Sequence, residues 1–452
     1  MLFENIGLKV PSILLPKKSL DYSQWAVVAC DQFTSEPEYW QNAANLVKGA
    51  PSTLNLIYPE VFLEEPEGEK TARIQKINQT MREYLNQGIF ETCDHSFILV
   101  DRRTSHVSSR KGLVVALDLE AYDYSRQSQT LIRATEGTIL DRIPPRVRIR
   151  EKAPLETPHI MVLIDDPQKT VIEPLFQHSL EKVYDVALMQ GGGHITGYRV
   201  SDPEWQQQVA ERLSKLAQRD LFDQKYGVAD KGVLLYAMGD GNHSLATAKA
   251  LWENLKKNAV DKSAVMSHPA RFALVELVNV HDAGLVFEPI HRVLFDVDYD
   301  HIVSAMSSYF AKQGASFSCD VFDQLPVAKE HCASLHQAPH THAVLFVAQQ
   351  RFGVFAITNP VLTLAVGTLQ SFLDDYLKAN SYAKIDYIHG EDVVTSLGSK
   401  SGNMGFYLSA MSKHDLFRTV IVDGALPRKT FSMGEASEKR YYLECRSISD
   451  RV

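Results

Sequence analysis

The chain has 452 residues, a net charge of −8 and an isoelectric point near 6.1. That length is more than one hydrophobic core usually serves, so we expect two or three domains. The hydrophobic content of 45% and the charged content of 23% are ordinary for a soluble globular protein. The acidic balance argues against a nucleic-acid partner, which normally requires a basic face.

Cysteine usage predicts a reducing compartment. The five cysteines are scattered, odd in number and never arranged as Cys-x-x-Cys, which argues against a disulfide framework or a thiolate zinc site. No stretch approaches the roughly 18 apolar residues that cross a bilayer, and no basic segment followed by an apolar one opens the chain. We therefore expect a cytoplasmic protein without a membrane partner, and the sequence does not fix its oligomeric state.

The first half of the chain alternates strand-like and helix-like segments. Apolar runs bounded by turn residues indicate strands, and apolar residues that recur at helical spacing indicate helices. The Gly-rich segment 190–193 joins two of these strands and is typical of a hairpin. The expected strands are 25–29, 96–100, 113–119, 159–164, 183–189 and 194–200, and the expected helices are 71–86 and 204–221.

The next segment carries the strongest functional signal. An apolar run at 233–238 leads into Gly239-Asp240-Gly241 and Asn242-His243-Ser244, after which apolar residues recur at helical spacing. This pattern predicts a buried strand, a tight turn and a helix start. The glycines allow positive φ and close approach of a ligand, and the free N–H groups of a helix start suit a phosphate. The alternative is a plain turn capped by Asp240 or Asn242.

Two other short segments place polar side chains where packing does not require them. Arg133 can bind a carboxylate or phosphate through two hydrogen bonds, and Glu136 can serve as a base or a metal ligand. His291 and Arg292 form a pair that suits an anionic ligand. A capped surface helix start at 133–138 and an exposed pair at 291–292 are the alternatives.

Glu276 interrupts an apolar strand expected at 272–280. A buried acid is costly unless it is paired or functional. Arg271 and Arg292 are its candidate partners, and structural pairing is favoured over a functional role.

A domain boundary is expected near residues 295–298. Beyond it the pattern predicts a helix at 300–312, strands at 343–347 and 352–358, and a helix at 368–378, while 424–440 is rich in turn formers and charges. The mixture of hairpins and helix-linked strands predicts an α+β protein. The expected domains are 1–296 and a smaller α+β domain at 297–452.

Several tempting motifs fail on their spacing. In the segment 398–402, Ser399 stands where a phosphate-binding P-loop needs a glycine before the lysine. The segment 191–197 lies between two strands and lacks the dinucleotide-binding spacing. No Gly-x-Ser-x-Gly elbow is present. The histidines near Cys332 match no familiar zinc site; they are His331, His336, His340 and His342.

Segments spread over nearly the whole chain resemble the uncharacterised bacterial and archaeal family called domain of unknown function 1015. The resemblance is carried by Asp240-Gly241-Asn242-His243 with the helix after it, and by 273–279, 284–292 and 426–430. Many members of that family read Asp-Gly-His-His-Arg at the turn. Here Asn242 and Ser244 replace the first histidine and the arginine.

The Asp-Gly-x-His turn in its turn resembles the ParB and sulfiredoxin-like nucleotide-binding fold. That group includes DNA-segregation CTPases, ATP-using sulfinic acid reductases and an ADP-dependent free serine kinase. The resemblance implies a ParB/sulfiredoxin-like mixed-sheet core with phosphates on the helix start. The DNA-binding branch is disfavoured by the acidic charge balance, and the reductase branch by Asn242, which stands where its cysteine belongs.

Together these patterns predict a small-molecule phosphotransferase or phosphohydrolase that binds a nucleotide or phosphorylated metabolite on the 239–244 turn. ATP or ADP and Mg²⁺ are the expected cofactors, and serine or phosphoserine the first substrates to consider. Asp240 is expected to bind magnesium or accept a proton, His243 to contact a phosphate, and Glu136 to be the alternative base. The expected phosphate- or substrate-binding residues are Gly239, Gly241, Asn242, Ser244, Arg133, His291 and Arg292. A non-catalytic ligand-binding regulatory protein is the alternative.

Overall fold

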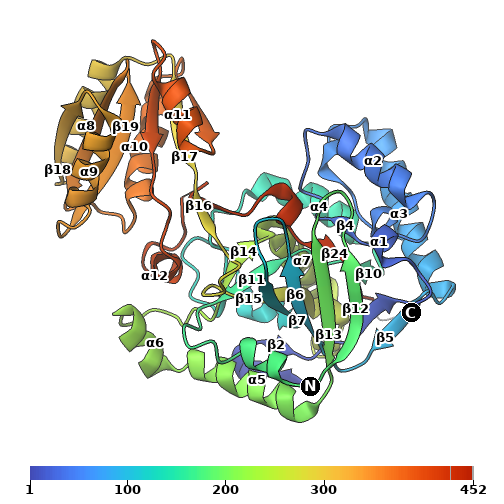
Figure 1. Ribbon diagram of the computed structural model, residues 1–452. Coiled ribbons are helices and arrows are strands. Elements are labelled where there is room, and N and C mark those ends of the chain that lie inside the picture. Colours follow the sequence, from blue (N-terminus) through green and yellow to red (C-terminus); the bar gives the residue numbers. More distant parts are fainter. Residues whose placement is uncertain (428, 450–452) are drawn as a thin grey trace. The chain divides into compact units, whose positions relative to one another are not determined.

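The computed structural model describes residues 1–427 and 429–449, and the chain divides into two compact units (Figure 1). The first unit comprises Met1–Val286 together with the described residues from Gly434 onward, and the second is Phe287–Met433. The sequence placed one boundary at 296/297 instead. The structure differs because β16 (Phe287–Pro289) pairs with β23 (Phe431–Met433) inside the second unit, after which the chain returns to the first.

A large mixed sheet forms the centre of the first unit, as the sequence predicted for the core (Figure 1). Most neighbours are antiparallel, but β11 runs parallel to β15, and β9 runs parallel to β14 and β8. The strand order is β12 (Glu181–Ala187), β13 (His194–Val200), β6 (Phe97–Arg103), β7 (Arg110–Asp118), β15 (Phe272–Asn279), β11 (Met161–Ile164), β14 (Tyr236–Asp240), β9 (Ile132–Arg133) and β8 (Tyr122–Asp123), with β1 (Leu2–Phe3) and β2 (Leu8–Lys9) added beside β7.

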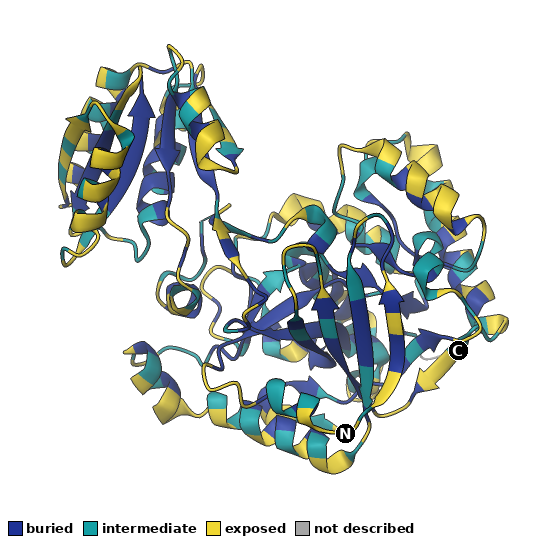
Figure 2. Ribbon diagram, in the orientation of Figure 1, coloured by how far each residue is buried: buried dark blue, intermediate teal, exposed yellow. Residues whose placement is uncertain are grey.

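The central strands β7, β15 and β11 are covered on both faces, which explains why they read as nearly continuous apolar runs. Successive side chains of a strand point to opposite faces, so Phe97 and Leu99 of β6 enter one core while Ile98 and Val100 enter the other. Figure 2 shows the central strands of the sheet as largely buried, whereas β12 at its edge carries exposed positions. The helices of the first unit are α1 (Tyr22–Trp25), α2 (Pro37–Val47), α3 (Glu67–Asn86), α4 (Ile143–Arg150), α5 (Pro203–Leu216), α6 (Arg219–Tyr226) and α7 (Asn242–Asn258).

Two predicted elements differ from the structure. The helix expected at 204–221 breaks into α5 and α6, because Gln218 adopts an extended conformation (φ −63°, ψ 126°) between them. The strand expected at 25–29 shrinks to β4 (Val27–Val28), with Trp25 ending α1. The predicted hairpin is confirmed as β12 and β13. Within the described residues, none of the helices is both long and apolar enough to span a bilayer.

The C-terminal segment, residues 434–449, is woven into the first unit. Its strand β24 (Tyr441–Tyr442) pairs with β4, and β25 (Arg446–Ser447) pairs with β10 (Leu155–Glu156). The indole Nε1 of Trp25 donates to the carbonyl of Leu443 at 2.9 Å. A further small sheet joins β3 (Ile13–Pro16) to β5 (Phe90–Cys93). Residues more than 400 positions apart in the chain therefore share one core.

The second unit is a smaller α+β layer structure, as predicted. Its antiparallel sheet has the order β18 (Ser316–Phe322), β20 (Arg351–Thr358), β19 (Thr341–Ala348), β22 (Met404–Tyr407), β17 (His291–Phe295) and β21 (Lys384–Ile388). Its helices are α8 (Tyr299–Lys312), α9 (Leu325–Leu335), α10 (Ala365–Ala379), α11 (Glu391–Gly398) and α12 (Lys413–Asp423). Apolar side chains pack on both faces of this sheet.

Candidate functional site

The predicted strand, turn and helix start is present at the end of β14. Gly241 is the N-cap of α7 and has φ +80°, a conformation that favours glycine. A Cβ added at Gly241 would also lie 3.1 Å from the Cα of Ile160. Neither Asp240 nor Asn242 is the N-cap residue, and no side chain of the N-cap residue bonds the helix start. The plain capped turn that the sequence left as an alternative is therefore not the arrangement observed.

Polar groups at this helix start remain available to a ligand. The first backbone bond of α7 runs from the N–H of Leu245 to the carbonyl of Gly241, so the N–H groups of residues 242–244 lie ahead of the helical ladder. Within the described part of the chain, the side-chain Oδ1 of Asn242 is buried and has no hydrogen-bond partner. The helix dipole adds positive potential here.

Asp240 and Lys439 form an ion pair beside the turn. The Nζ of Lys439 lies 3.2 Å from Oδ2 of Asp240, and Oδ1 accepts the N–H of Gly241 at 2.8 Å. Burial favours the neutral form of Asp240, but the charge of Lys439, the neighbouring His159 and the hydrogen bond from the N–H of Gly241 together outweigh it and lower the pKa of the carboxyl. Asp240 is therefore ionised at neutral pH.

His159 is the centre of a second polar cluster at the same helix start. Its Nε2 lies 3.1 Å from Oγ of Ser244, and its Nδ1 lies 2.7 Å from the hydroxyl of Tyr442. The carboxylate Oδ2 of Asp31 lies 3.7 Å from Nε2. The Tyr442 hydroxyl also accepts the N–H of Cys30 at 3.1 Å, which fixes its position.

His243 faces the segment that carries Glu136. The Nε2 of His243 accepts the N–H of Ile139 at 3.3 Å, and Thr135 donates through Oγ1 to the carbonyl of Met238 at 2.7 Å. These two contacts hold residues 135–139 against the end of β14 and the start of α7, so Glu136 lies in the segment that covers the turn. Burial and the charges of Arg146 and Arg142 lower the pKa of His243. A neutral imidazole is consistent with acceptance at Nε2.

A cavity opens beside this cluster. His159, Ser244, Thr247 and Tyr442 line its polar side. Its other wall is mostly apolar and comes from α3, α4 and the segment 56–63. Predominantly apolar lining with a few convergent polar groups is typical of a small-molecule site. The apolar lining residues include Leu56, Ile57, Leu63, Ile77, Met81 and Ile149.

The three arginines of α4 form a basic stripe that nearby carboxylates largely neutralise. Arg146 pairs with Glu60, Arg148 with Glu67, and Arg150 with Glu156. Arg150 and Arg146 both line the cavity together with their acidic partners. The stripe therefore adds little net charge to the cavity.

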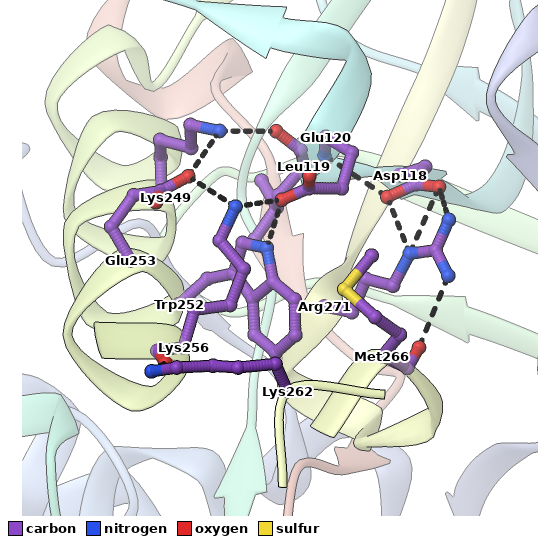
Figure 3. Close-up of polar contacts among 10 residues, drawn as sticks. All are labelled: Asp118, Leu119, Glu120, Lys249, Trp252, Glu253, Lys256, Lys262, Met266 and Arg271. Atoms are coloured by element: carbon purple, nitrogen blue, oxygen red, sulfur yellow. Dashed lines mark hydrogen bonds and ion pairs between the residues drawn. The ribbon is translucent and has the colours of Figure 1, made fainter. Parts of the chain in front are cut away.

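The second half of α7 is anchored to the residues that follow β7, as Figure 3 shows. Lys249 donates to the carbonyl of Leu119 at 2.9 Å, and Trp252 Nε1 and Lys256 Nζ reach Oε1 of Glu120 at 2.5 and 2.6 Å. Glu253 bridges the two lysines at 2.7 and 3.1 Å. Next to it, Arg271 pairs with Asp118 at 2.6 Å. This network fixes α7 and so holds its start in place.

Arg133 occupies a structural position. Its guanidinium is 2% exposed and donates to the carbonyls of Thr130 at 2.9 Å and Gly232 at 2.5 Å. The sequence predicted an anion-binding arginine here, whereas the structure directs these donors to the backbone of the β9 region. Burial lowers the pKa of Arg133 to about 10.

His291 and Arg292 belong to the second unit and are buried in it. Nδ1 of His291 accepts the N–H of Leu408 at 3.0 Å. Nε of Arg292 donates to Gln370 at 3.1 Å, and its guanidinium lies 5.3 Å from the ring centre of Tyr387. The exposed pair considered as an alternative is therefore wrong, since His291 is 2% exposed and Arg292 is fully buried.

Glu276 is paired, but not with either arginine that the sequence suggested. Arg440 of the C-terminal segment forms its ion pair and also bonds Glu444 at 2.5 Å. Arg271 instead pairs with Asp118. Structural pairing of Glu276 is confirmed, whereas its partner is 164 residues away and carried no local signal.

The described residues contain no group of three or more His, Cys, Asp or Glu side chains arranged to hold a metal ion. At Asp240, one oxygen accepts the Gly241 N–H and the other faces Lys439. This donor set does not fit a protein-built magnesium site, since magnesium requires near-octahedral oxygen ligation.

Sequence reasoning missed the residues that complete the site. Asp31, His159, Tyr442 and Lys439 come from three segments that lie far apart in the chain and match no motif. A histidine at the first position of the strand expected at 159–164 and the charged segment 424–440 were the only signals. Their role becomes visible only in the folded chain, where His159, Lys439 and Tyr442 lie beside the start of α7.

Comparison with protein families now identifies the group to which the chain belongs. The family model described as Protein of unknown function (DUF1015) matches residues 14–376. The chain therefore belongs to this family, as the resemblance implied. No curated protein matches the chain.

Solved structures with distant similarity were also found. Free serine kinase in complex with AMP is 12% identical, with 77% of this chain and 94% of that chain covered and a TM-score of 0.36. A mutant of free serine kinase in complex with ADP is 11% identical, with 77% and 95% covered and a TM-score of 0.37. A conserved hypothetical protein from Pyrococcus furiosus is 11% identical, with 74% and 95% covered and a TM-score of 0.33.

Proposed function

We propose that this protein binds a nucleotide or phosphorylated metabolite through a phosphate placed on the 239–244 turn, and that it transfers or hydrolyses the phosphoryl group. The observation that carries the proposal is the start of α7. It has a glycine N-cap without a capping side chain, lies beside the Lys439 ammonium, and adjoins a cavity at Ser244. Backbone N–H groups and a lysine are the donors that phosphate recognition uses.

In this proposal, different groups around the turn bind the phosphate, accept a proton and hold the body of the ligand. The N–H groups of Asn242, His243 and Ser244 and the ammonium of Lys439 hold phosphate oxygens and neutralise charge that grows in the transition state. Asp240, ionised at neutral pH, keeps Lys439 in place and accepts the proton of the attacking hydroxyl or water. The body of the ligand occupies the mostly apolar cavity. ATP or ADP is the proposed phosphoryl carrier, with magnesium held mainly by its phosphates and water.

Calorimetry tests the binding half of the proposal. ATP, ADP, serine and phosphoserine are titrated with and without magnesium; the two serine compounds are included because the sequence resemblance extends to a free serine kinase. We expect nucleotide or phosphoserine binding that weakens in His243→Ala, because this variant loses the contact with Ile139 that holds residues 135–139 beside the turn. Asn254→Ala, at an exposed position of α7 remote from the turn, is the matched control. Absence of binding by all four ligands contradicts the proposal.

Turnover tests the catalytic half. Asp240→Asn keeps the shape of the side chain and removes its charge, so we expect an unchanged fold by circular dichroism and turnover lower by about 100-fold or more. Glu136→Gln tests the alternative base in the same assay. If Asp240→Asn turns over at the native rate, Asp240 has no part in the chemistry. Binding without turnover in the native protein favours the ligand-binding regulatory protein instead.

A further inference from the structure

Ser244 and His159 form a hydrogen-bonded pair at the mouth of the cavity. Oγ of Ser244 and Nε2 of His159 are 3.1 Å apart, and both residues line the same cavity. The other ring nitrogen of His159 is held by the Tyr442 hydroxyl at 2.7 Å. A hydroxyl, a base within hydrogen-bond reach and a third group that orients the base are the arrangement of an activated nucleophile.

We propose that Ser244 is a nucleophile activated by His159 and that it takes up the phosphoryl group of the bound ligand. This inference rests on the proposed function and names the group that receives the phosphate first. Ser244 is also one of the two positions at which the turn departs from the Asp-Gly-His-His-Arg pattern, so the pair is a property of this chain's own residues.

The surroundings of the pair suit this role. Ser244 is the third residue of α7, so its hydroxyl lies in the positive potential of the helix start, where the N–H groups of residues 242–244 can bind phosphate oxygens. His159 is 7% exposed, so little water competes for its ring. The Asp31 carboxylate, 3.7 Å from Nε2, stabilises the imidazolium that forms when His159 accepts a proton.

The phosphoryl group moves in two displacements, first to Ser244 and then to water or an acceptor hydroxyl. With Nδ1–H of His159 donating to Tyr442, Nε2 accepts the Ser244 proton as Oγ bonds the phosphorus. The bond between phosphorus and the leaving oxygen breaks, and His159 returns the proton to that oxygen. Water or an acceptor hydroxyl then attacks the phosphoserine and loses its proton to Asp240 as the bond between phosphorus and Oγ breaks. Oγ takes a proton from solvent water to restore the Ser244 hydroxyl, and Asp240 releases its proton to solvent.

A fluorophosphonate probe tests the nucleophile independently of the natural ligand. Attack by an activated serine forms the Oγ–P bond and expels fluoride, with the proton taken by the base. The native protein is incubated with the probe, and labelling is followed by intact mass and located by peptide mapping. We expect one label on Ser244, loss of that label in Ser244→Ala, and labelling about 100-fold slower in His159→Gln.

The control is Ser267→Ala. This exposed serine donates to the carbonyl of Ala264 at 2.8 Å and has no histidine partner in the described contacts, so its loss should leave labelling unchanged. No label on Ser244 of the folded native protein overturns the inference. Equal labelling rates in the native protein and a folded His159→Gln variant overturn it as well.

The binding titrations separate this inference from the proposed function. Phosphate-ligand binding without labelling of Ser244 leaves the proposed function standing and removes the nucleophile. Labelling of Ser244 without binding by any phosphate ligand keeps the activated serine but overturns the phosphate site. The native protein is also incubated with ATP and analysed by mass spectrometry for a phosphate on Ser244. A phosphate there supports both the phosphate site and the Ser244 nucleophile.

Discussion

Lys439 and Arg440 are neighbours in the chain, and each forms an ion pair with the central sheet of the first unit, but the two pairs differ in exposure. The Arg440 and Glu276 side chains are each 2% exposed. Those of Lys439 and Asp240 are 18% and 26% exposed. The buried Arg440–Glu276 pair is shielded from ligands and supports the fold. The partly exposed Lys439–Asp240 pair, called the open pair below, can also contact a ligand. One short segment thus supplies a structural centre and a candidate functional one.

The buried pair should dominate stability, because removing Arg440 leaves two buried carboxylates, Glu276 and Glu444, without their shared cation. We expect Arg440→Met to lower the free energy of unfolding by about 3–5 kcal/mol, measured by urea denaturation. Arg148→Met is the control, since its pair with Glu67 is 45% and 66% exposed and its loss should leave stability nearly unchanged. If Arg440→Met and Arg148→Met lower the free energy of unfolding equally, the buried pair is no more important for stability than the exposed one.

Asp165 is another buried carboxylate of the first unit, and the pH dependence of its ionisation tests how much such a buried pair stabilises the fold. Its carboxylate is 3% exposed and binds Lys225 at 2.9 Å, His281 at 2.6 Å and Tyr226 at 2.5 Å. Burial opposes its ionisation, but the hydrogen bond from His281 and the charge of Lys225 prevail and lower the pKa of Asp165 to about 2.

A depressed carboxyl pKa stabilises the fold above the unfolded value of 3.8, and the contribution is lost as the pH falls towards 2. We therefore expect Asp165→Asn to cost about 2 kcal/mol at pH 7 and progressively less between pH 4 and pH 2. Urea midpoints of both proteins across this range measure the difference. If the difference in stability between the native protein and Asp165→Asn grows as the pH falls, the ionised Asp165 carboxylate does not stabilise the fold.

The open pair should matter least for stability and most for ligand binding. Lys439→Met should change the free energy of unfolding by less than about 1 kcal/mol. It should weaken binding of the phosphate ligand found by calorimetry roughly ten- to hundred-fold, since a hydrogen bond to a charged group contributes about 1.5–3 kcal/mol. Lys182→Met, which breaks an exposed pair with Asp185 at 2.5 Å, is the control. Unchanged affinity removes Lys439 from the site.

The local pattern of the sequence determined much of the first unit's sheet and the turn itself. Continuous apolar runs gave β6, β7 and β15, and the Gly-rich connection gave the β12–β13 hairpin. The glycines around Asp240 gave the strand, turn and helix start. These features are set by neighbouring residues, through apolar periodicity and the backbone freedom of glycine, so they are readable without tertiary structure.

Only the tertiary structure decided which side chains meet at that turn. Lys439, Tyr442, His159 and Asp31 reach the start of α7 because β24 pairs with β4 and the C-terminal segment re-enters the first unit. The same packing gave Glu276 its partner in Arg440. Burial of charge requires a specific partner but does not dictate where in the chain that partner lies, so sequence pattern can show the need for a pair and the fold alone can supply it.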